Sequence, residues 1–293
     1  MSTKAPTTPS PQISAGTALG PVRLVVSDVD RQRSFYRDAI GLSQVWESDG
    51  GVSLGASAGV PLVDLRPLPG APSRPGHSTG LFHQALLVPD RPALARAIRR
   101  VLDTGWQFTG ASDHLVSEAM YLDDPEGNGI EIYRDRPREE WPRVGGTIQM
   151  ATEPMDLEGV MSELPAGSDA GMDAATTIGH VHLSVAELDA AERFYSGLLG
   201  FDVTVRGYPG ALFVSAGGYH HHLGLNTWRS RGGPRAPAGA RGLDHFTVRL
   251  AAPGELEQVA GRLDAAGVAV EPVAGGLLAG DPSGIRVRLL PAA

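Results

Sequence analysis

The chain has no cysteine among its 293 residues. This absence excludes disulfide bonds, thiolate metal ligands, iron–sulfur clusters and a cysteine nucleophile. The sequence also lacks an apolar run long enough to span a bilayer, a G-x-S-x-G nucleophile elbow and a Walker-type phosphate loop. A formal net charge of −8 argues against a dense basic face for nucleic acid. We therefore expect a cytoplasmic protein with neither nucleic acid nor a membrane as its partner.

Glycine, proline and histidine are well represented. The 38 glycines and 23 prolines indicate many short elements joined by turns. Nine histidines are the most informative polar residues, because cysteine is missing. Residues 1–18 are rich in Ser, Thr, Pro and Ala without a central apolar run, and we interpret them as a disordered tail.

The chain is an internal duplication. Residues 19–42 and 178–201 share a Gly, a Val, a Phe-Tyr pair and a final Gly at one constant offset. Further along, GLFHQALLV at 80–88 is repeated as GLDHFTVRL at 242–250. The duplication predicts two domains, 19–140 and 178–291, joined by a linker over 141–177.

Each half divides again into two units of the same plan. Val22, Leu24 and Val26 alternate with their neighbours as a half-buried strand does. In the second half Leu188 begins a helical pattern that Gly200 ends, at a position suited to a left-handed cap. The unit is βαβββ, repeated four times. The fold class is α+β, with tandem duplicated domains whose curled mixed sheets surround a cavity.

Three segments carry a family resemblance: HLVSEAMYLDDPEGNGIE at 114–131, GNGIEIYRDRPREEW at 127–141 and SAGGYHHHLGLNTW at 215–228. With the four βαβββ units, they resemble the vicinal oxygen chelate (VOC) superfamily of glyoxalases, bleomycin-resistance proteins and extradiol dioxygenases. The similarity is strongest to the two-domain, catechol 2,3-dioxygenase-like branch, and it covers 19–291. The extradiol signature departs only at Ser112, where that pattern expects Gly or a few other residues.

The resemblance implies a divalent metal held by His83 and Glu131. Both side chains alternate onto the cavity face of their strands, and a carboxylate between two isoleucines is costly unless it is paired or metal-bound. An ion pair with a nearby arginine is the other reading of Glu131.

The third ligand has two candidate sources. The equivalent first-strand position of the first half holds Arg23, which does not ligate metals, and Arg288 replaces the glutamate in the second half. In one arrangement the second and third modules pair across the halves, and His182, with His222 as a fourth ligand, completes the site. In the other, Asp64 completes it within the first domain. We favour the first arrangement, in which the first and fourth modules form a degenerate pocket.

The implied reaction is ring cleavage of a catechol-like aromatic diol with O2, an oxidoreductase activity of aromatic compound catabolism. Fe(II) is the expected cofactor and Mn(II) the alternative. The resemblance makes Tyr121 both a catalytic and a substrate-binding residue. Further candidates are His114 and His77 for catalysis, and His220 and His180 for binding substrate.

Two other functions stay open on the same fold. One is a glyoxalase-type isomerase or lyase, and the other is a metal-free small-molecule binding or resistance protein. Aromatic residues could line the cavity in each case: Trp46, Phe82, Tyr133 and Trp228. The sequence leaves open whether the chain forms a homo-oligomer.

Overall fold

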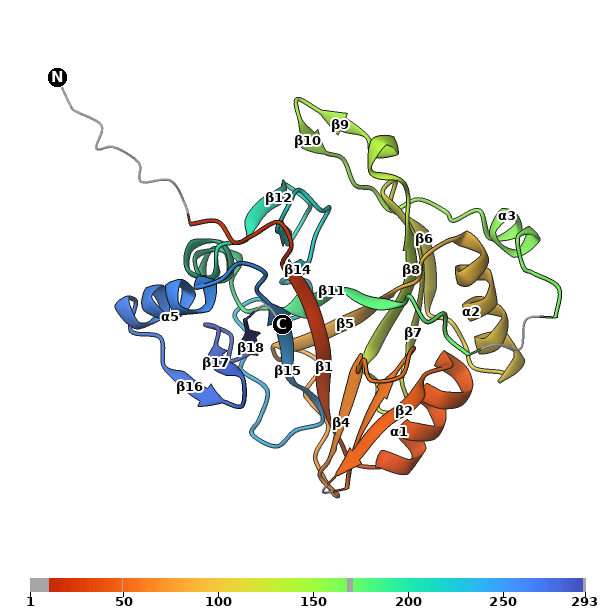
Figure 1. Cartoon of the computed structure of the whole chain (residues 1–293), viewed down its shortest axis with the longest axis horizontal. Coiled ribbons are helices and arrows are strands. Elements are labelled where there is room, and N and C mark those ends of the chain that lie inside the picture. The colour runs from red at the N-terminus through yellow and green to blue at the C-terminus, as the bar shows by residue number, and fades with distance from the viewer. Residues whose placement is uncertain (1–10, 49, 168–170, 292–293) are drawn as a thin grey trace.

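Two eight-stranded mixed β-sheets form the body of the protein in the computed structural model (Figure 1). The structure describes residues 11–48, 50–167 and 171–291. Residues 1–10 of the expected disordered tail lie outside this range, whereas the described remainder packs on the second half. There the Ile13 amide donates to the Gly200 carbonyl at 3.0 Å, and the Ile13 side chain is buried. Within the described residues, no helix is long and apolar enough to cross a membrane.

The first sheet has the strand order β16-β17-β18-β15-β1-β4-β3-β2. Its strands and helices are β1 (Ala18–Val26), α1 (Val29–Phe35), η1 (Tyr36–Ile40), β2 (Ser43–Ser48), β3 (Gly51–Gly55), β4 (Val63–Pro67), β15 (Gly242–Arg249), α5 (Glu255–Ala265), β16 (Val270–Val273), β17 (Gly276–Gly280) and β18 (Arg286–Leu290).

The second sheet has the strand order β12-β13-β14-β11-β5-β8-β7-β6. Its strands and helices are β5 (Gly80–Leu87), α2 (Arg91–Asp103), β6 (Gly110–Asp113), β7 (Ser117–Asp123), β8 (Gly129–Asp135), β11 (Thr177–Ser184), α4 (Leu188–Glu192), η3 (Arg193–Leu199), β12 (Asp202–Arg206), β13 (Ala211–Ser215) and β14 (Leu223–Asn226).

Each sheet takes one βαβββ module from each half of the chain. β1 of the first module pairs antiparallel with β15 of the fourth, and β5 of the second pairs antiparallel with β11 of the third. The fourfold βαβββ plan of the sequence is confirmed. The structure has the arrangement in which the second and third modules pair across the halves.

The helices begin and end where local chemistry requires it. The Asp28 and Asp90 side chains accept hydrogen bonds from the amides three residues later and so cap α1 and α2. Gly41 and Gly200 end η1 and η3 with φ of 87° and 100°, a left-handed conformation that favours glycine. The stop predicted at Gly200 is therefore confirmed.

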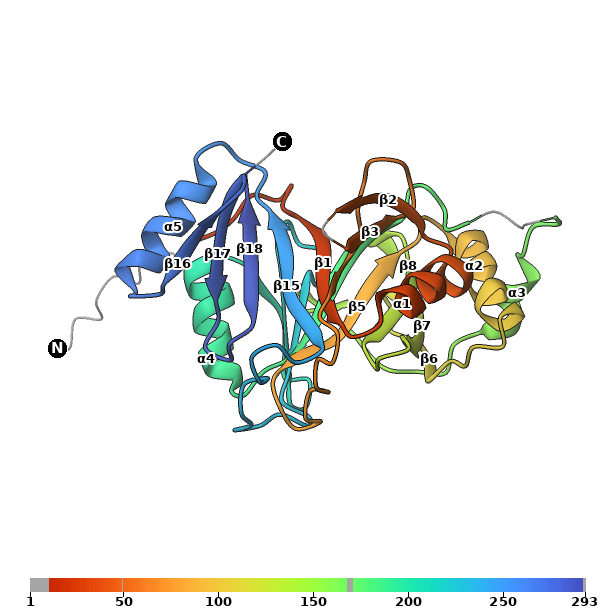
Figure 2. The same cartoon turned by 90° about the horizontal axis from the view of Figure 1, so that it is seen from below.

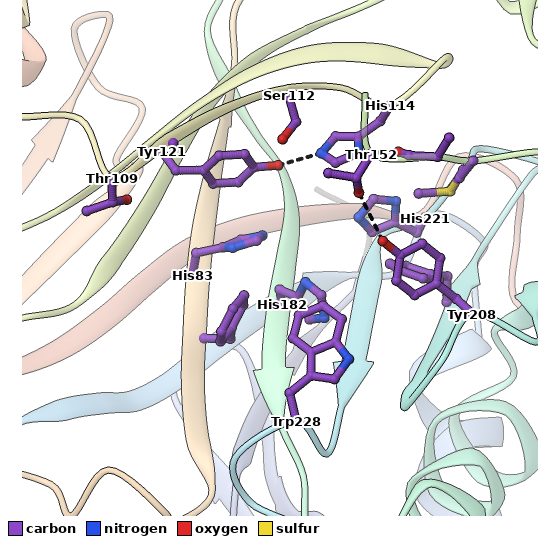
Figure 3. Close-up of a pocket in the computed structure, with 15 residues that line it drawn as sticks. His83, Thr109, Ser112, His114, Tyr121, Thr152, His182, Tyr208, His221 and Trp228 are labelled. Carbon is purple, nitrogen blue, oxygen red and sulfur yellow. Dashed lines mark hydrogen bonds between the residues drawn. The ribbon is translucent and has the colours of Figure 1, made fainter. Parts of the chain in front are cut away.

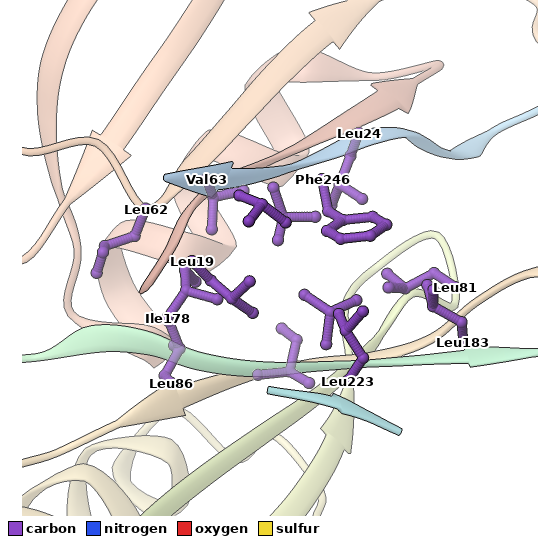
Figure 4. Packing of buried hydrophobic residues seen from close by; sticks show 14 of the residues in the cluster. Leu19, Leu24, Leu62, Val63, Leu81, Leu86, Ile178, Leu183, Leu223 and Phe246 are labelled. Carbon is purple, nitrogen blue, oxygen red and sulfur yellow. The ribbon is translucent and has the colours of Figure 1, made fainter. Parts of the chain in front are cut away.

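The main core lies between the two sheets. In Figure 4, Leu24 and Phe246 of the first sheet face Leu183 and Leu223 of the second, and all four are fully buried. In Figure 2, α1 and α2 lie on one side of the molecule and α4 and α5 on the other. Because side chains alternate along a strand, the residues between these core positions face away from the core, and they form the outer face of each sheet.

The stretch expected as a linker is partly structured. It follows η2 (Arg138–Glu140) and includes β9 (Arg143–Val144), β10 (Thr147–Ile148) and α3 (Leu157–Ser162). Trp141 and Ile148 are buried in a small cluster with Val116 and Tyr219. The segment is thus anchored on the second sheet rather than simply joining the two halves.

The loop before β18 buries a carboxylate. Asp281 is 3 % exposed, accepts from the Ile285 amide at 2.8 Å and from the Tyr195 hydroxyl at 3.0 Å, and burial raises its pKa to about 6. Since this value exceeds that of an unfolded aspartate, about 3.9, protonation favours the folded state. The stabilisation is complete below pH about 4 and is lost as the pH rises through about 6.

We predict that Asp281→Asn removes this pH dependence. The free energy of unfolding of the wild type, relative to that of the variant, should be greater at pH 4 than at pH 7 by up to about 3 kcal/mol. Urea denaturation at both pH values measures it. The control is Asp264→Asn, at an exposed position. It should change the free energy of unfolding by the same amount at pH 4 and at pH 7. An equal wild-type-to-variant difference at both pH values would contradict the prediction.

Candidate metal centre

The candidate site is built on the central pair of strands of the second sheet. β5 and β11 run antiparallel, with His83 opposite His182, and β8 lies beside β5 with Glu131 next to Ala85. Side chains on this outer face therefore come from both halves of the chain.

Two register shifts adjust the outer face. In the β5–β11 pairing, Phe82 and Gly179 are extra residues that have no partner on the opposite strand. The first shift lets both Phe82 and His83 line one cavity, whereas simple alternation predicts Phe82 against the helix. At the second, a Cβ on Gly179 would lie 1.9 Å from the Tyr133 hydroxyl, so only glycine fits.

Three side chains converge at this point. The Glu131 Oε2 atom lies 3.0 Å from His83 Nε2 and 3.1 Å from His180 Nε2, and the two imidazole nitrogens are 3.3 Å apart. All three residues are buried, at 2–7 % exposure. The expected pair of His83 and Glu131 comes together, but the third member is His180, which the sequence assigned to substrate binding.

The triad fits a divalent metal. Ligand atoms about 2.1 Å from one ion lie about 3.0–3.4 Å from each other, which is the spacing seen here. Two imidazoles and one carboxylate are the donors that Fe(II) and Mn(II) accept. Among the described residues, Glu131 forms no ion pair with an arginine. Arg134, three residues later, bonds instead to Glu118. The arginine ion pair considered from the sequence thus belongs to Glu118.

The protonation states suit a metal. Burial alone would raise the pKa of the Glu131 carboxyl, but the charges and hydrogen bonds of His180 and His83 hold it well below its usual value. Burial lowers the pKa of His180, despite the opposing attraction of Glu131. The site therefore offers a carboxylate and a neutral imidazole at neutral pH, as metal ligation requires.

A cavity of about 330 Å³ opens beside the triad (Figure 3). His83 and His182 lie at its floor, with Tyr121 and His114 across from them. Its lining residues are Phe82, His83, Thr109, Gly110, Ser112, His114, Tyr121, Met150, Ala151, Thr152, His182, Tyr208, Phe213, His221 and Trp228.

A hydrogen-bonded pair forms one wall of the cavity. His114 Nε2 lies 2.6 Å from the Tyr121 hydroxyl, and His114 Nδ1 lies 2.7 Å from the Ala151 carbonyl. Since a carbonyl only accepts, Nδ1 carries the proton and Nε2 accepts from Tyr121. Burial and the negative charge of Glu131 raise the pKa of Tyr121 well above its usual value, so the phenol stays protonated.

His182 lines the cavity but does not join the triad. Its ring centroid is 5.0 Å from that of His83, and burial holds its pKa well below the usual value. A Cβ on Gly224 would lie 2.8 Å from the His182 ring, so this glycine makes room for the imidazole. In place of the predicted ligand role, the structure gives His182 a position on the cavity floor.

His222 points away from the triad, contrary to the ligand set expected from the sequence. Its Nδ1 accepts from the Ala216 amide at 3.1 Å, and burial lowers its pKa to about 4. The prediction extended strand alternation through 220–222, but β14 begins only at Leu223. Gly217 and Gly218, both with positive φ, turn the chain just before, and it is His221 that faces the cavity.

The other predicted site residues lie elsewhere. Asp64 is on the first sheet, 3.3 Å from Arg23, and so cannot complete the site. His77 is exposed in the loop before β5 and does not line the cavity. His220 is fully buried behind the lining, where its ring nitrogens lie 2.8 Å from His221 and from Asp135. Of the four aromatic candidates, only Phe82 and Trp228 line the cavity.

Sequence reasoning did not identify several lining residues. Phe213 and Tyr208 come from the third module, and Met150 and Thr152 from the segment interpreted as a linker. The Thr152 hydroxyl lies 2.9 Å from that of Tyr208 and joins these two parts at the cavity edge. The available signal was that the family resemblance extends into MATEPMDLEG at 150–159.

We predict that His180→Ala abolishes tight binding of one divalent metal per chain, whereas His182→Ala retains it. The reason is that, of these two histidines, His180 lies within ligand distance of both His83 and Glu131 and His182 is not in that group. Metal content after reconstitution and desalting measures this, with the partly buried His222→Ala as a control that should keep its metal. Metal loss in His182→Ala but not in His180→Ala would restore the ligand set expected from the sequence.

The sequence and the fold are similar to those of known proteins. A catechol-2,3-dioxygenase from Bacillus subtilis (strain 168) is 42% identical over 274 residues, which are 92% of this chain and 95% of the relative. Two crystal structures share the fold at 16% identity. A candidate dioxygenase from Bacillus subtilis subsp. subtilis str. 168 has a TM-score of 0.69 and matches over 96% of this chain and 86% of its own. Glyoxalase I from Zea mays has a TM-score of 0.57 and matches over 94% and 93%.

The family assignment rests on both halves of the chain. Residues 18–132 and residues 177–289 both match the same family model. The site lies where these two matched segments pair. The chain belongs to the Glyoxalase/Bleomycin resistance protein/Dioxygenase superfamily.

Proposed function

We propose that this protein is an extradiol dioxygenase that cleaves a catechol-like aromatic diol with O2. The observation that carries the proposal is the buried triad of His83, Glu131 and His180 beside an aromatic-lined cavity. The 42% identity to a catechol-2,3-dioxygenase over nearly the whole chain supports the same activity.

The triad would hold Fe(II), with Mn(II) as the alternative. A metal bound there would supply Lewis-acid and one-electron chemistry to the diol and O2, and three protein ligands leave coordination positions open for both. All three side chains are buried, and His83 also lines the cavity, so the triad would meet the substrate on that side.

The cavity would bind the flat face of the substrate ring. Phe82, Phe213 and Trp228 surround His182 on one side, with ring centroids 5.1–5.8 Å from its imidazole. Aromatic walls of this kind bind a planar ring by stacking and edge contacts. None of the lining residues is Lys, Arg, Asp or Glu, so an uncharged diol fits best.

Tyr121 and His114 would handle the substrate proton. The Tyr121 oxygen donates its own hydrogen to His114 Nε2 and keeps lone pairs free to accept from a diol hydroxyl. A proton leaving the diol can therefore pass to Tyr121 as the phenol proton passes to His114. The Ala151 carbonyl holds His114 in the tautomer that this transfer needs.

The two alternative functions have less support. A glyoxalase-type isomerase uses a second carboxylate at the metal, and no Asp or Glu lines the described cavity. In a metal-free binding protein the ligand side chains need not converge, whereas three of them do here. A cytoplasmic location and a homo-oligomeric state stay predictions.

We predict that the protein reconstituted with Fe(II) under reductant converts a catechol from a diol panel to a yellow ring-cleavage product. Glu131→Ala should lose both the metal and the activity. Absorbance assays and metal analysis on the same samples measure the two effects. A wild-type protein that binds one Fe(II) per chain but leaves every diol unchanged would contradict the proposal.

We predict that Tyr121→Phe lowers kcat about 10- to 100-fold and leaves the metal content unchanged, because the proton path is broken while the triad stays intact. Tyr208→Phe is the matched control, since it removes a cavity hydroxyl whose hydrogen-bond partner among the described residues is Thr152. Its kcat should stay within about threefold of the wild type. Equal losses in both variants would argue against a specific role for Tyr121.

A further inference from the structure

The outer face of the first sheet holds a counterpart of the metal centre. Arg23 pairs with His245 across β1 and β15, just as His182 pairs with His83 across β11 and β5. Around its central strand pair, the first sheet thus has four positions that correspond to His83, Glu131, His180 and His182 of the second sheet.

The counterpart cannot bind a metal in the same way. By register, Pro21, just before Val22, takes the place of His180, just before Val181. Arg288 of β18, which pairs with Thr247 of β15, takes the place of Glu131. Only one imidazole survives, and two of the other three positions hold guanidinium groups, which do not ligate metals.

A cavity of about 390 Å³ nevertheless opens on this face. The indole of Trp46 is 42 % exposed, and it lines the cavity together with apolar and cationic side chains. The lining residues are Arg23, Trp46, Ser48, Gly51, Val52, Asp64, Leu65, Arg66 and Pro67.

Two carboxylates in this region are already bonded. Asp64 accepts hydrogen bonds from Ser53 and from Arg23, the latter at 3.3 Å. Asp244 is bonded by Arg286 and lies 3.1 Å from His245. Both acids are at least nine-tenths buried at their side chains, and of the two only Asp64 lines the cavity.

The arginines in this region outnumber the two acids. Arg66 lies 3.9 Å from Asp244, at the limit of an ion pair, and its side chain is 47 % exposed. Arg288 bonds to a carbonyl through Nη2, and its Nε is buried without a hydrogen-bond partner among the described residues. Burial, followed by the nearby charge of Arg23, lowers the pKa of Arg288. Arg23, Arg66 and Arg288 thus lie on one face of the first sheet.

We propose that this cavity binds a small, planar organic carboxylate. Arg23 and Arg66 would receive the carboxylate, and the guanidinium fork matches its two oxygens. Trp46, Leu65 and Pro67 would contact the apolar part of the ligand. Asp64 and Asp244 disfavour a multiply charged anion such as phosphate, because they leave only a small excess of positive charge.

The site differs from the catalytic cavity in the charge it selects. The catalytic cavity has no Arg or Lys lining it, whereas the counterpart has two arginines. Extradiol cleavage turns a neutral diol into a carboxylic acid, so the product falls in the class that the second cavity selects, a point that rests on the proposed function.

The test is calorimetric titration of the full chain with sodium benzoate, with neutral benzamide as the matched ligand. Benzoate should bind, and Arg66→Gln should weaken it about tenfold. Arg99→Gln, which removes an exposed arginine on α2, should leave the affinity unchanged. The titration is repeated in Glu131→Ala, where benzoate should bind as in the wild type, because no turnover is needed.

Four outcomes would overturn the proposal. The first is no binding of benzoate up to about 10 mM, and the second is equal binding of benzamide. The third is benzoate binding that Arg66→Gln leaves unchanged, which would place benzoate in the catalytic cavity. The fourth is binding of inorganic phosphate in preference to benzoate. None of them bears on the diol assay, so a failure here is distinct from a failure of the dioxygenase proposal.

Discussion

The antiparallel pairing of β5 with β11 is the constraint on which the rest of the site depends. It joins the second module to the third and brings an imidazole from each half to one carboxylate on β8. Without this pairing, His83 and Glu131 would supply only two of the three ligands. The bulges at Phe82 and Gly179 then adjust which side chains reach the cavity.

Much of the fold was predictable because duplication repeats its signals. The four βαβββ units, the glycine cap at Gly200 and the convergence of His83 with Glu131 follow from periodicity and from the family resemblance. The choice of His180 over His182 was not predictable, because both alternate onto one face and a one-residue bulge decides between them. His221 was missed because a turn, not a strand, carries it.

The two sheets show how duplicated modules diverge. Their topology and strand register are the same, but one outer face carries imidazoles and a carboxylate, and the other carries arginines. At the position beside His182 the second sheet has Gly224, whereas beside Arg23 the first sheet has Asp64. Each first-strand residue is thus matched by its neighbour, either with space for a ring or with a charge for a guanidinium.

Sharing one metal centre between two halves has a thermodynamic consequence. A ligand that binds only the assembled form stabilises it in proportion to the logarithm of its concentration over its Kd. Because His83 and Glu131 belong to one half and His180 to the other, a bound metal acts as a cross-link between them. The tighter the ion binds, the larger is its contribution to the free energy that holds the two halves together.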